Sequence, residues 1–295
     1  MSKTADYVVA GIGAGLGNQM FQYAAARRLA HVNGAELLLY IVKQTPGTHA
    51  VYGLHRFQTG GRIVTAAEAG GLKRPGKPRR LLTKLLPSLT SADPEVVREE
   101  ELVFNPAILE LRRNVKLSGY WQCERYFADI AGIVREEFTL RDPLDAQSSA
   151  ALARIESGPS AFIHVRRGDY VNSADPSKSH GTCPEAYYNE AIATLRQRIG
   201  PGLRFYVFSN DPAWVRENKI GGEGAEVIDW NGERPERDLA LMRACRHAVI
   251  ANSSFSWWGA WLGDGRERIV IAPRVWYRTL PECNDILPER WLKLG

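Results

Sequence analysis

Metal-ligand patterns are missing from this 295-residue chain. Its four cysteines are widely separated and none forms C-x-x-C, while its six histidines show neither H-x-x-H nor H-x-x-x-H spacing. Those spacings bring two ligands together on one turn or one helix face, so a zinc site is not expected. Scattered cysteines in a chain of this size indicate a reducing cytosol rather than a disulfide scaffold.

Membrane-spanning and targeting patterns are missing as well. No apolar run approaches the roughly 20 residues that span a bilayer. The first residues, MSKTADYVVAGIG, lack a basic region followed by a long apolar run, so we expect no signal peptide and a cytoplasmic location. The net charge of +5 favours anionic ligands but is not the clustered excess of a nucleic-acid binder, so no nucleic-acid partner is expected.

The glycine-rich loop near the N-terminus does not match a dinucleotide-binding fingerprint. In GIGAGLGNQ, residues 11–19, Leu16 and Asn18 occupy the two positions where a third glycine would be needed. The next predicted strand also ends without the acid that would bind a ribose. Two interpretations stay open: a structural strand-to-helix turn, or a loop with little side-chain bulk at which a ligand approaches the backbone.

Strands and helices alternate along the chain, which predicts an α/β fold with parallel sheets. In the first half we expect a strand at 7–12, a helix at 19–34, a strand at 35–42, and a strand leading into a helix over 114–127. In the second half we expect strands at 161–166, 203–208, 225–230, 248–251 and 268–273, with helices at 184–200, 212–219, 236–247 and 254–263.

The polar, proline-containing stretch at 139–150 is the predicted boundary between domains 1–150 and 151–295. Residues 73–84 carry six basic residues and no acid, and acidic residues follow them. We interpret this part as a solvated helical insertion near 72–100 in the first domain. The alternative is a surface that faces anionic lipid or glycan, which would place the protein at the inner face of the membrane. We expect the C-terminal tail to pack back on the first domain.

Polar side chains follow four strands of the second half, at the point where each strand ends. The clusters are Arg166, Arg167 and Asp169; Ser209, Asn210 and Asp211; Asp229, Trp230 and Asn231; and Asn252, Ser253 and Ser254. The carboxyl ends of parallel strands share one edge of a sheet, and ligands bind there in open α/β sheets. The sequence therefore predicts a binding site at this edge.

The chemistry of this edge favours an anion. Ser253 and Ser254 open a predicted helix, either as a plain N-cap or, beside two arginines, as part of a phosphate cradle. An arginine fork matches phosphate oxygens and stays charged. The chain also has no D-x-D pair, through which many sugar-nucleotide transferases hold a divalent cation. We therefore expect a site without metal or cofactor, in which Arg166 and Arg167 hold a diphosphate.

Some residues permit two interpretations. His164 is either a core histidine or a ligand contact, since it lies two residues before Arg166. Asp169 is either a general base or, as we favour, the group that orients an arginine. Trp257, Trp258 and Trp261 stand at helical spacing and are predicted to be core residues rather than a platform for a sugar.

Five segments together resemble the motifs of the α-1,2-fucosyltransferases of glycosyltransferase family 11. They are GLGNQMFQYA (15–24), GYWQCERYF (119–127), HVRRGDY (164–170), FSNDPAW (208–214) and ANSSFSWWGAWLG (251–263). They run in order along most of the chain. One departure is that Ala14 and Gly15 precede Leu16 where the family commonly has two glycines. We expect the adjacent Gly15 to keep the loop flexible.

The resemblance implies a glycosyltransferase-B fold, with two Rossmann-like domains whose parallel sheets face each other across a cleft. The second domain would bind GDP-β-L-fucose, and the first would lie on the acceptor side. The reaction would be an inverting, metal-independent transfer of L-fucose to the 2-hydroxyl of a terminal β-galactoside glycan, in surface polysaccharide or oligosaccharide synthesis. The alternatives are a related transferase with another donor, and a non-catalytic GDP or glycan binder.

The resemblance also assigns residues by motif. Arg166 would contact the β-phosphate with Arg167 beside it, and Asn18 would lie near the reacting sugar. The remaining expected donor contacts are His164 and Asp238 near the guanine, Ser253, Ser254 and Phe255 around phosphate and base, and Gly15, Gly17, Gln19, Asn210, Asp211 and Asn252. No residue is identified as the general base beyond the possibility of Asp169.

Overall fold

The computed structural model describes residues 6–42, 51–69, 95–112, 114–167, 182–263, 265, 267–277 and 285–295. The chain forms two compact units, and each is built around its own sheet. Unit 1 comprises Met1–Leu54 and Thr59–Val134, and unit 2 comprises His55–Gln58 and Arg135–Gly295.

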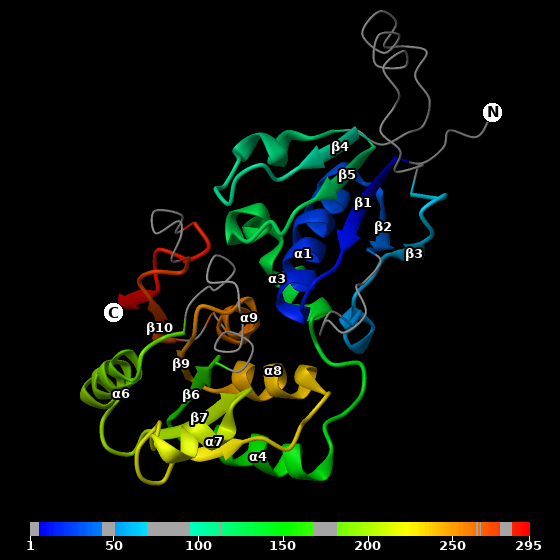
Figure 1. The fold of residues 1–295 in the computed structure, drawn as a ribbon. Helices are drawn as coiled ribbons and strands as arrows, with labels where there is room; N and C mark the ends of the chain where they lie inside the picture. The colour runs from blue at the N-terminus through cyan, green and yellow to red at the C-terminus, as the bar shows by residue number, and fades with distance from the viewer. Residues whose placement is uncertain are drawn as a thin grey trace, which may run out of the picture. The chain divides into compact units, whose positions relative to one another are not determined.

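Unit 1 contains a five-stranded parallel sheet in the order β3-β2-β1-β5-β4 (Figure 1). Its strands are β1 (Tyr7–Ile12), β2 (Glu36–Ile41), β3 (Arg62–Val64), β4 (Glu95–Arg98) and β5 (Val115–Ser118). Helix α1 (Leu16–Asn33) returns from the carboxyl end of β1 to the amino end of β2, and its residues 19–26 are all buried, so this part of the helix is covered on every side. Short 3-10 helices, η3 (Pro106–Glu110), η4 (Glu124–Tyr126) and η5 (Ala128–Ile130), follow β4 and β5.

Unit 2 contains a six-stranded parallel sheet in the order β11-β10-β9-β6-β7-β8. Its strands are β6 (Ser160–Val165), β7 (Arg204–Ser209), β8 (Glu226–Ile228), β9 (His247–Val249), β10 (Val270–Pro273) and β11 (Leu292–Leu294). Its helices are α4 (Ala146–Glu156), α6 (Glu185–Ile199), α7 (Pro212–Glu217), α8 (Pro235–Ala244) and α9 (Ser254–Leu262).

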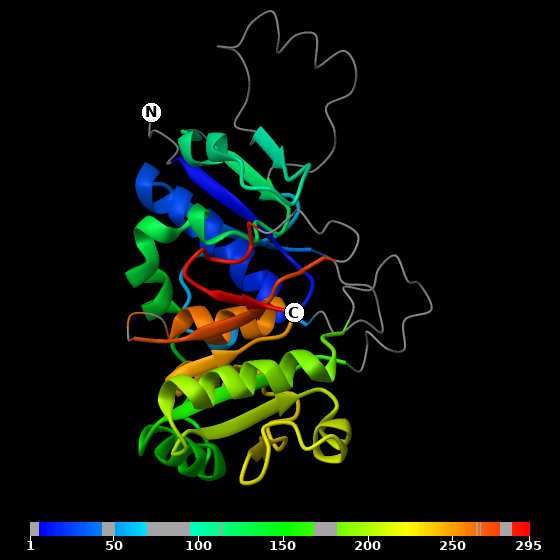
Figure 2. The same ribbon diagram turned by 90° about the vertical axis from the view of Figure 1, so that its left-hand side faces the viewer.

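The core of unit 2 surrounds β6, in which every residue is buried. One face packs against α6, whose Tyr188, Ala191 and Leu195 lie in the same apolar cluster as alternate residues of β6 (Figure 2). The opposite face carries Phe162 and His164, and the latter contacts Phe255 of α9. A strand buried on both faces reads as an unbroken apolar run, which is why the sequence predicts β6 well.

The three tryptophans of α9 are core residues, as predicted. Trp257, Trp258 and Trp261 are each at most 1% exposed and pack ring against ring. The indole nitrogen of Trp257 donates to the carbonyl of Ile286 at 2.6 Å. Buried indoles find such a partner because an unpaired N–H in the core is costly.

Several element boundaries differ from the sequence predictions. Helix α1 begins at Leu16 rather than at Gln19, so Asn18 lies inside its first turn and not in the loop before it. Pro184 is the extended N-cap of α6 and not its first helical residue. In the predicted helical insertion, residues 70–94 lie outside the described residues, and Glu95–Arg98 forms strand β4. The β-branched pair Val96 and Val97 favours that strand, which pairs with β5.

The two units divide inside helix α3 (Ala131–Glu137), between Val134 and Arg135. Residues 139–150, where the sequence predicts the boundary, lie in unit 2 and include the start of α4. A carboxylate oxygen of Asp145 accepts the backbone N–H of Ser148 at 2.8 Å and caps that helix. The C-terminal tail, expected to return to the first domain, forms the edge strand β11 of the unit 2 sheet.

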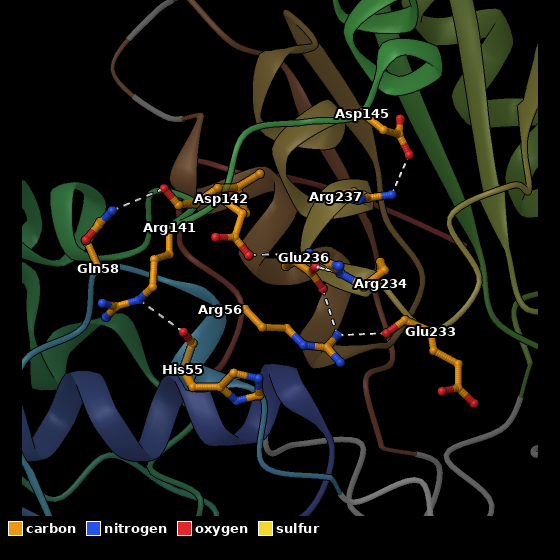
Figure 3. A network of polar contacts seen from close by, with 11 residues as sticks. His55, Arg56, Gln58, Arg141, Asp142, Asp145, Glu233, Arg234, Glu236 and Arg237 are labelled. Carbon is orange, nitrogen blue, oxygen red and sulfur yellow. Dashed lines mark hydrogen bonds and ion pairs between the residues drawn. The ribbon is translucent and has the colours of Figure 1, made fainter.

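A short segment from the first half of the sequence belongs to unit 2. Phe57 forms a β-bridge with Leu140 and packs edge-on against Phe138, with ring centroids 5.7 Å apart. The neighbouring Arg56 pairs with Glu236 of α8 at 2.7 Å (Figure 3). These contacts join residues more than eighty positions apart, so no local pattern predicts them.

The loop between β1 and α1 adopts a left-handed conformation at Ala14, with φ of 62°, and not at Gly15, with φ of −65°. The left-handed residue of this loop is therefore the alanine, while Gly15 has an ordinary extended backbone. An alanine in this region costs roughly 1–2 kcal/mol because its Cβ crowds the following carbonyl oxygen. Glycine, which the family commonly has before the leucine, would avoid that cost.

We predict that Ala14→Gly stabilises unit 1 by about 0.5–1 kcal/mol, because relief of the left-handed strain exceeds the entropy gained by the unfolded chain. Gly34 provides a matched control at the other end of α1, since it has φ of 58° and open space around its Cβ position. Gly34→Ala should lower stability by about 1 kcal/mol. Denaturant unfolding measures both, and a loss of stability in Ala14→Gly would contradict the prediction.

Candidate active site

The strand ends that the sequence predicts to share one edge of a sheet do so in unit 2. Strands β9, β6 and β7 are neighbours in the sheet, so the residues after each of them meet at one edge. The backbone N–H of Arg167 donates to Asn210 Oδ1 at 2.9 Å, and Ser209 Oγ donates to the Val165 carbonyl at 2.9 Å. The chain after β6 is thereby tied to the chain after β7.

Arg167 is held by residues after β7. Its guanidinium lies 4.1 Å from the ring centroid of Trp214, and its Nε is 3.8 Å from a carboxylate oxygen of Asp211. The other carboxylate oxygen of Asp211 accepts the Trp214 backbone N–H at 3.2 Å and caps α7. Asp211 therefore orients Arg167; Asp169, for which we expected an orienting role, lies outside the described residues, and that expectation stays a prediction.

His164 is a neutral imidazole under the edge. It is 4% exposed, and its ring centroid lies 5.8 Å from that of Phe255. Burial, together with the positive charge of Arg166, lowers the pKa of His164 to about 3. Its Nδ1 is buried and makes no hydrogen bond within the described part of the chain. A ligand group with matching polarity would satisfy that atom.

The loop from Ala251 to Ser254 is organised by backbone and side-chain contacts. Asn252 donates to the carbonyl of Trp276 at 3.4 Å and is 4% exposed, so it helps to fix the loop. Ser253 is the N-cap of α9, yet its side chain makes no capping hydrogen bond. The plain N-cap interpretation is therefore wrong for its hydroxyl. The first-turn N–H groups of α9 and this hydroxyl form the arrangement that favours a phosphate.

Asp238 on α8 belongs to a buried polar chain. Its carboxylate accepts from Asn231 Nδ2 at 2.6 Å, and Asn231 Oδ1 accepts from Ser148 Oγ at 2.9 Å. Burial, opposed by the Asn231 hydrogen bond and assisted by the charge of nearby Glu236, raises the pKa of Asp238 to about 7. The charge of Asp238 therefore changes near neutral pH.

A second acid on α8, Glu236, is surrounded by arginines (Figure 3). It is 2% exposed and pairs with Arg56 at 2.7 Å and with Arg234 at 2.5 Å. Arg237, one residue further on, pairs with Asp145 at the start of α4. Buried acids need such partners because an uncompensated charge in the core is very costly. Glu236 therefore fixes the start of α8, and with it the position of Asp238.

In unit 1, the polar side chains of GLGNQMFQYA hold neighbouring loops in place. Gln19 is fully buried, and its amide donates to the carbonyls of Ala14 and Val51 and accepts from the Gly53 N–H, at 2.8–2.9 Å. Gln19 therefore holds the backbone of these two loops in place. Asn18 Oδ1 accepts from Gln122 Nε2 at 2.7 Å, which leaves its amide N–H groups as donors.

Two glutamines that sequence reasoning did not single out complete this arrangement. Gln22 accepts from the Gly13 N–H at 2.8 Å and donates to the Gly119 carbonyl at 3.1 Å, and Gln122 orients Asn18. For Gln22, the sequence offered one indication, a polar amide among the apolar residues of the predicted helix.

Two glycines of the same motif differ in their surroundings. Gly15 has open space at its Cβ position, so packing does not require a glycine there, whereas Gly17 is buried in α1.

Among the described residues there is no group of three His, Cys, Asp or Glu side chains arranged to hold a metal ion. In the same part of the chain, no helix is both long enough and apolar enough to cross a membrane.

The family model described as "Glycosyl transferase family 11" matches residues 105–293. The chain belongs to glycosyltransferase family 11. The resemblance read from the five segments is thereby confirmed at the level of the family.

The chain is similar to proteins that differ in their named activities. An Escherichia coli protein named α-1,2-colitosyltransferase is 34% identical over 97% of this chain and 98% of its own length. The Escherichia coli O-antigen biosynthesis glycosyltransferase WbnK is 29% identical over 95% and 98%. Galactoside α-(1,2)-fucosyltransferase 1 of Lagothrix lagotricha is 30% identical over 84% of this chain and 63% of its own length.

Solved structures confirm the glycosyltransferase-B fold. The structure of NodZ α-1,6-fucosyltransferase soaked with GDP-fucose matches with a TM-score of 0.50 and 15% identity, over 88% of this chain and 93% of that one. POFUT1 in complex with GDP matches with a TM-score of 0.50 and 13% identity, over 91% and 99%. At such low identity the similarity establishes the fold alone.

The raised pKa of Asp238 generates a stability prediction for this family 11 protein. The buried acid prefers a proton in the folded state, so its favourable contribution is fully present below the unfolded pKa near 4 and is lost as pH rises through about 7. Asp238→Asn copies the protonated shape and does not titrate. Without nucleotide, the variant should gain stability over the parent between pH 5 and pH 8 in denaturant unfolding. A difference that stays constant with pH would contradict the assignment.

Proposed function

We propose that this protein transfers L-fucose from GDP-β-L-fucose to the 2-hydroxyl of a terminal β-galactoside, with inversion and without a metal ion. The carboxyl edge of the unit 2 sheet carries the proposal, because two arginines, a helix N-terminus and a serine hydroxyl that makes no helix-capping hydrogen bond gather there. The names of the family 11 relatives support transfer to form an α-1,2 linkage. Their names also support a place in surface polysaccharide synthesis.

In the proposed reaction, the acceptor hydroxyl attacks the anomeric carbon on the side opposite the diphosphate. The bond to GDP breaks, the new glycosidic bond forms, and the hydroxyl proton leaves to a base or to water. Negative charge grows on the departing GDP, and Arg166 with the start of α9 would stabilise it. Asp211 and Trp214 would hold Arg167 beside it. In this scheme arginine neutralises the charge of the leaving group, a role that a metal ion has in other transferases.

A second donor is favoured by one observation. The relative with 34% identity over nearly the whole chain is named α-1,2-colitosyltransferase. Colitose is L-fucose without its 3-hydroxyl, so the two donors share the nucleotide, the anomeric carbon and the leaving group. The edge of unit 2 described above would serve either donor. A non-catalytic GDP or glycan binder is the remaining alternative.

Product analysis in EDTA separates these possibilities. The protein is incubated with lactose and, in turn, GDP-fucose, GDP-colitose, GDP-mannose and UDP-galactose, and each product is measured by mass and by NMR of the new linkage. We expect an α-1,2-fucosylated product with EDTA present. If a product forms only from GDP-colitose, colitose and not fucose is the donor sugar. Activity that requires added metal would contradict the metal-free mechanism. GDP binding without any product would favour the non-catalytic binder.

We predict that Arg166→Ala lowers kcat by about 10²–10³-fold while the protein stays folded, because one contact to the developing negative charge is lost. Arg154→Ala is a matched control: this arginine is 46% exposed and pairs with Glu226 at the amino end of β8, away from the carboxyl edge. It should keep parent turnover. Parent-like turnover in Arg166→Ala would contradict the assignment.

Two further expectations stay predictions. A cytoplasmic location is proposed from the sequence. Contact of the basic segment 73–84 with a membrane cannot be related to structure, because that segment lies outside the described residues.

A further inference from the structure

The loop after β5, residues 119–122, lies at the carboxyl edge of the unit 1 sheet, beside the loop after β1. Strands β1 and β5 pair directly, and Gln122 reaches across to Asn18 in the first turn of α1. None of the motif residues assigned by resemblance accounts for the shape of this loop. Loops at the carboxyl ends of parallel strands are where α/β proteins place binding groups.

The backbone of this loop is strained at Trp121, which has φ of 59°. For a bulky side chain a positive φ is a genuine outlier. Such residues persist only when the surroundings determine them, and they cluster at active sites and ligand clamps. We therefore look for the contacts that hold this strained backbone in place and for a function that the strained conformation serves.

The support comes from Glu99, directly after β4. One of its carboxylate oxygens accepts the Tyr120 N–H at 2.6 Å and the other accepts the Trp121 N–H at 3.0 Å. A Cβ on Gly119 would lie 2.4 Å from the Cβ of Glu99, so a glycine is required for this approach. The Trp121 ring is 2% exposed and packs edge-on against Tyr126. Three separate anchors thus fix the loop.

The consequence is that Tyr120 is exposed. With Trp121 buried and the backbone fixed, Tyr120 remains 41% exposed, and it is the one aromatic residue among the exposed large hydrophobic residues in the described part of unit 1. A tyrosine ring combines an apolar face with a polar tip. The Asn18 amide, oriented by Gln122, adds hydrogen-bond donors from the neighbouring loop. An exposed aromatic ring and an oriented amide on two neighbouring loops match a sugar, which has one apolar face of C–H groups and a rim of hydroxyls.

We propose that loop 119–122 and Asn18 form the acceptor subsite, in which Tyr120 stacks on the apolar face of the terminal β-galactoside and Asn18 donates a hydrogen bond to one of its hydroxyls. Glu99 is a positioning residue, because both of its oxygens are used to hold the loop backbone. The proposal rests on the proposed function for the class of acceptor. It uses contacts within unit 1 alone.

The test compares Tyr120→Ala, Tyr120→Phe and Val32→Ala with the parent. Val32 is also 41% exposed, but it lies near the end of α1, towards the amino edge of the sheet. Tyr120→Ala should raise KM for lactose about tenfold, as loss of a binding hot spot does, with GDP affinity unchanged. Tyr120→Phe keeps the ring and should stay within about threefold, and Val32→Ala should match the parent. A KM within twofold of the parent in Tyr120→Ala would overturn the subsite.

Glu99→Gln tests the positioning role. The amide cannot accept both backbone N–H groups, so the loop should lose its fixed shape, and KM for lactose should rise while the GDP Kd stays at the parent value. Glu99→Asp, which retains the carboxylate, should recover part of the loss. Variants with parent KM for lactose would show that Glu99 does not act on this loop. Equal weakening of GDP and lactose binding would indicate general damage to the fold and would also contradict the role.

Direct binding of lactose separates this proposal from the proposed function. Saturation-transfer NMR of the parent with lactose and GDP should show contact with the sugar, and Tyr120→Ala should reduce it. Lactose binding that depends on Tyr120 without any transfer would contradict the proposed function and leave the subsite in place. Lactose binding unaffected by Tyr120→Ala, or no lactose binding by the parent, would overturn the subsite.

Discussion

The burial of β6 is the constraint on which the site of unit 2 depends. A parallel strand covered on both faces can carry charge only beyond its ends. The apolar run stops at Val165 and the two arginines follow at once, which places them at the edge shared with Asn210 and Ser253. The same burial keeps His164 neutral, with its pKa lowered to about 3. Positive charge at this edge therefore comes from arginine at any ordinary pH.

Buried polar side chains fix the positions of the loops in both units. In unit 1, Gln19 and Gln22 use their amides to hold three loops to α1. In unit 2, Ser148 and Asn231 form a chain of hydrogen bonds that ends on Asp238. A buried polar group without partners is costly, so each such network favours one arrangement of the loops it joins. Groups that bind a ligand must be held to within a fraction of an ångström, and these networks supply that restraint.

Periodicity and strand ends predict the parallel sheets and the edge of unit 2, because those features depend on local sequence. The resemblance assigned the family, which the family model confirmed. Contacts between distant segments could not be predicted: Phe57 pairs with Leu140, and Arg56 reaches Glu236 on α8. Backbone strain was equally hidden, since nothing local marks Ala14 or Trp121 as left-handed. The role of a side chain could not be predicted either: the sequence places Asp211 at the strand end, but only the structure reveals that it orients Arg167 and caps α7.

The central claim is that the carboxyl edge of the unit 2 sheet holds the diphosphate of the donor through arginine. A crystal structure of the protein with GDP, grown in EDTA, tests it most directly. The account predicts diphosphate oxygens about 3 Å from the Arg166 guanidinium, the length of a charge-assisted hydrogen bond, with the start of α9 on the other side. GDP bound at the Gly15 loop of unit 1, or bound only when a metal ion is supplied, would contradict it.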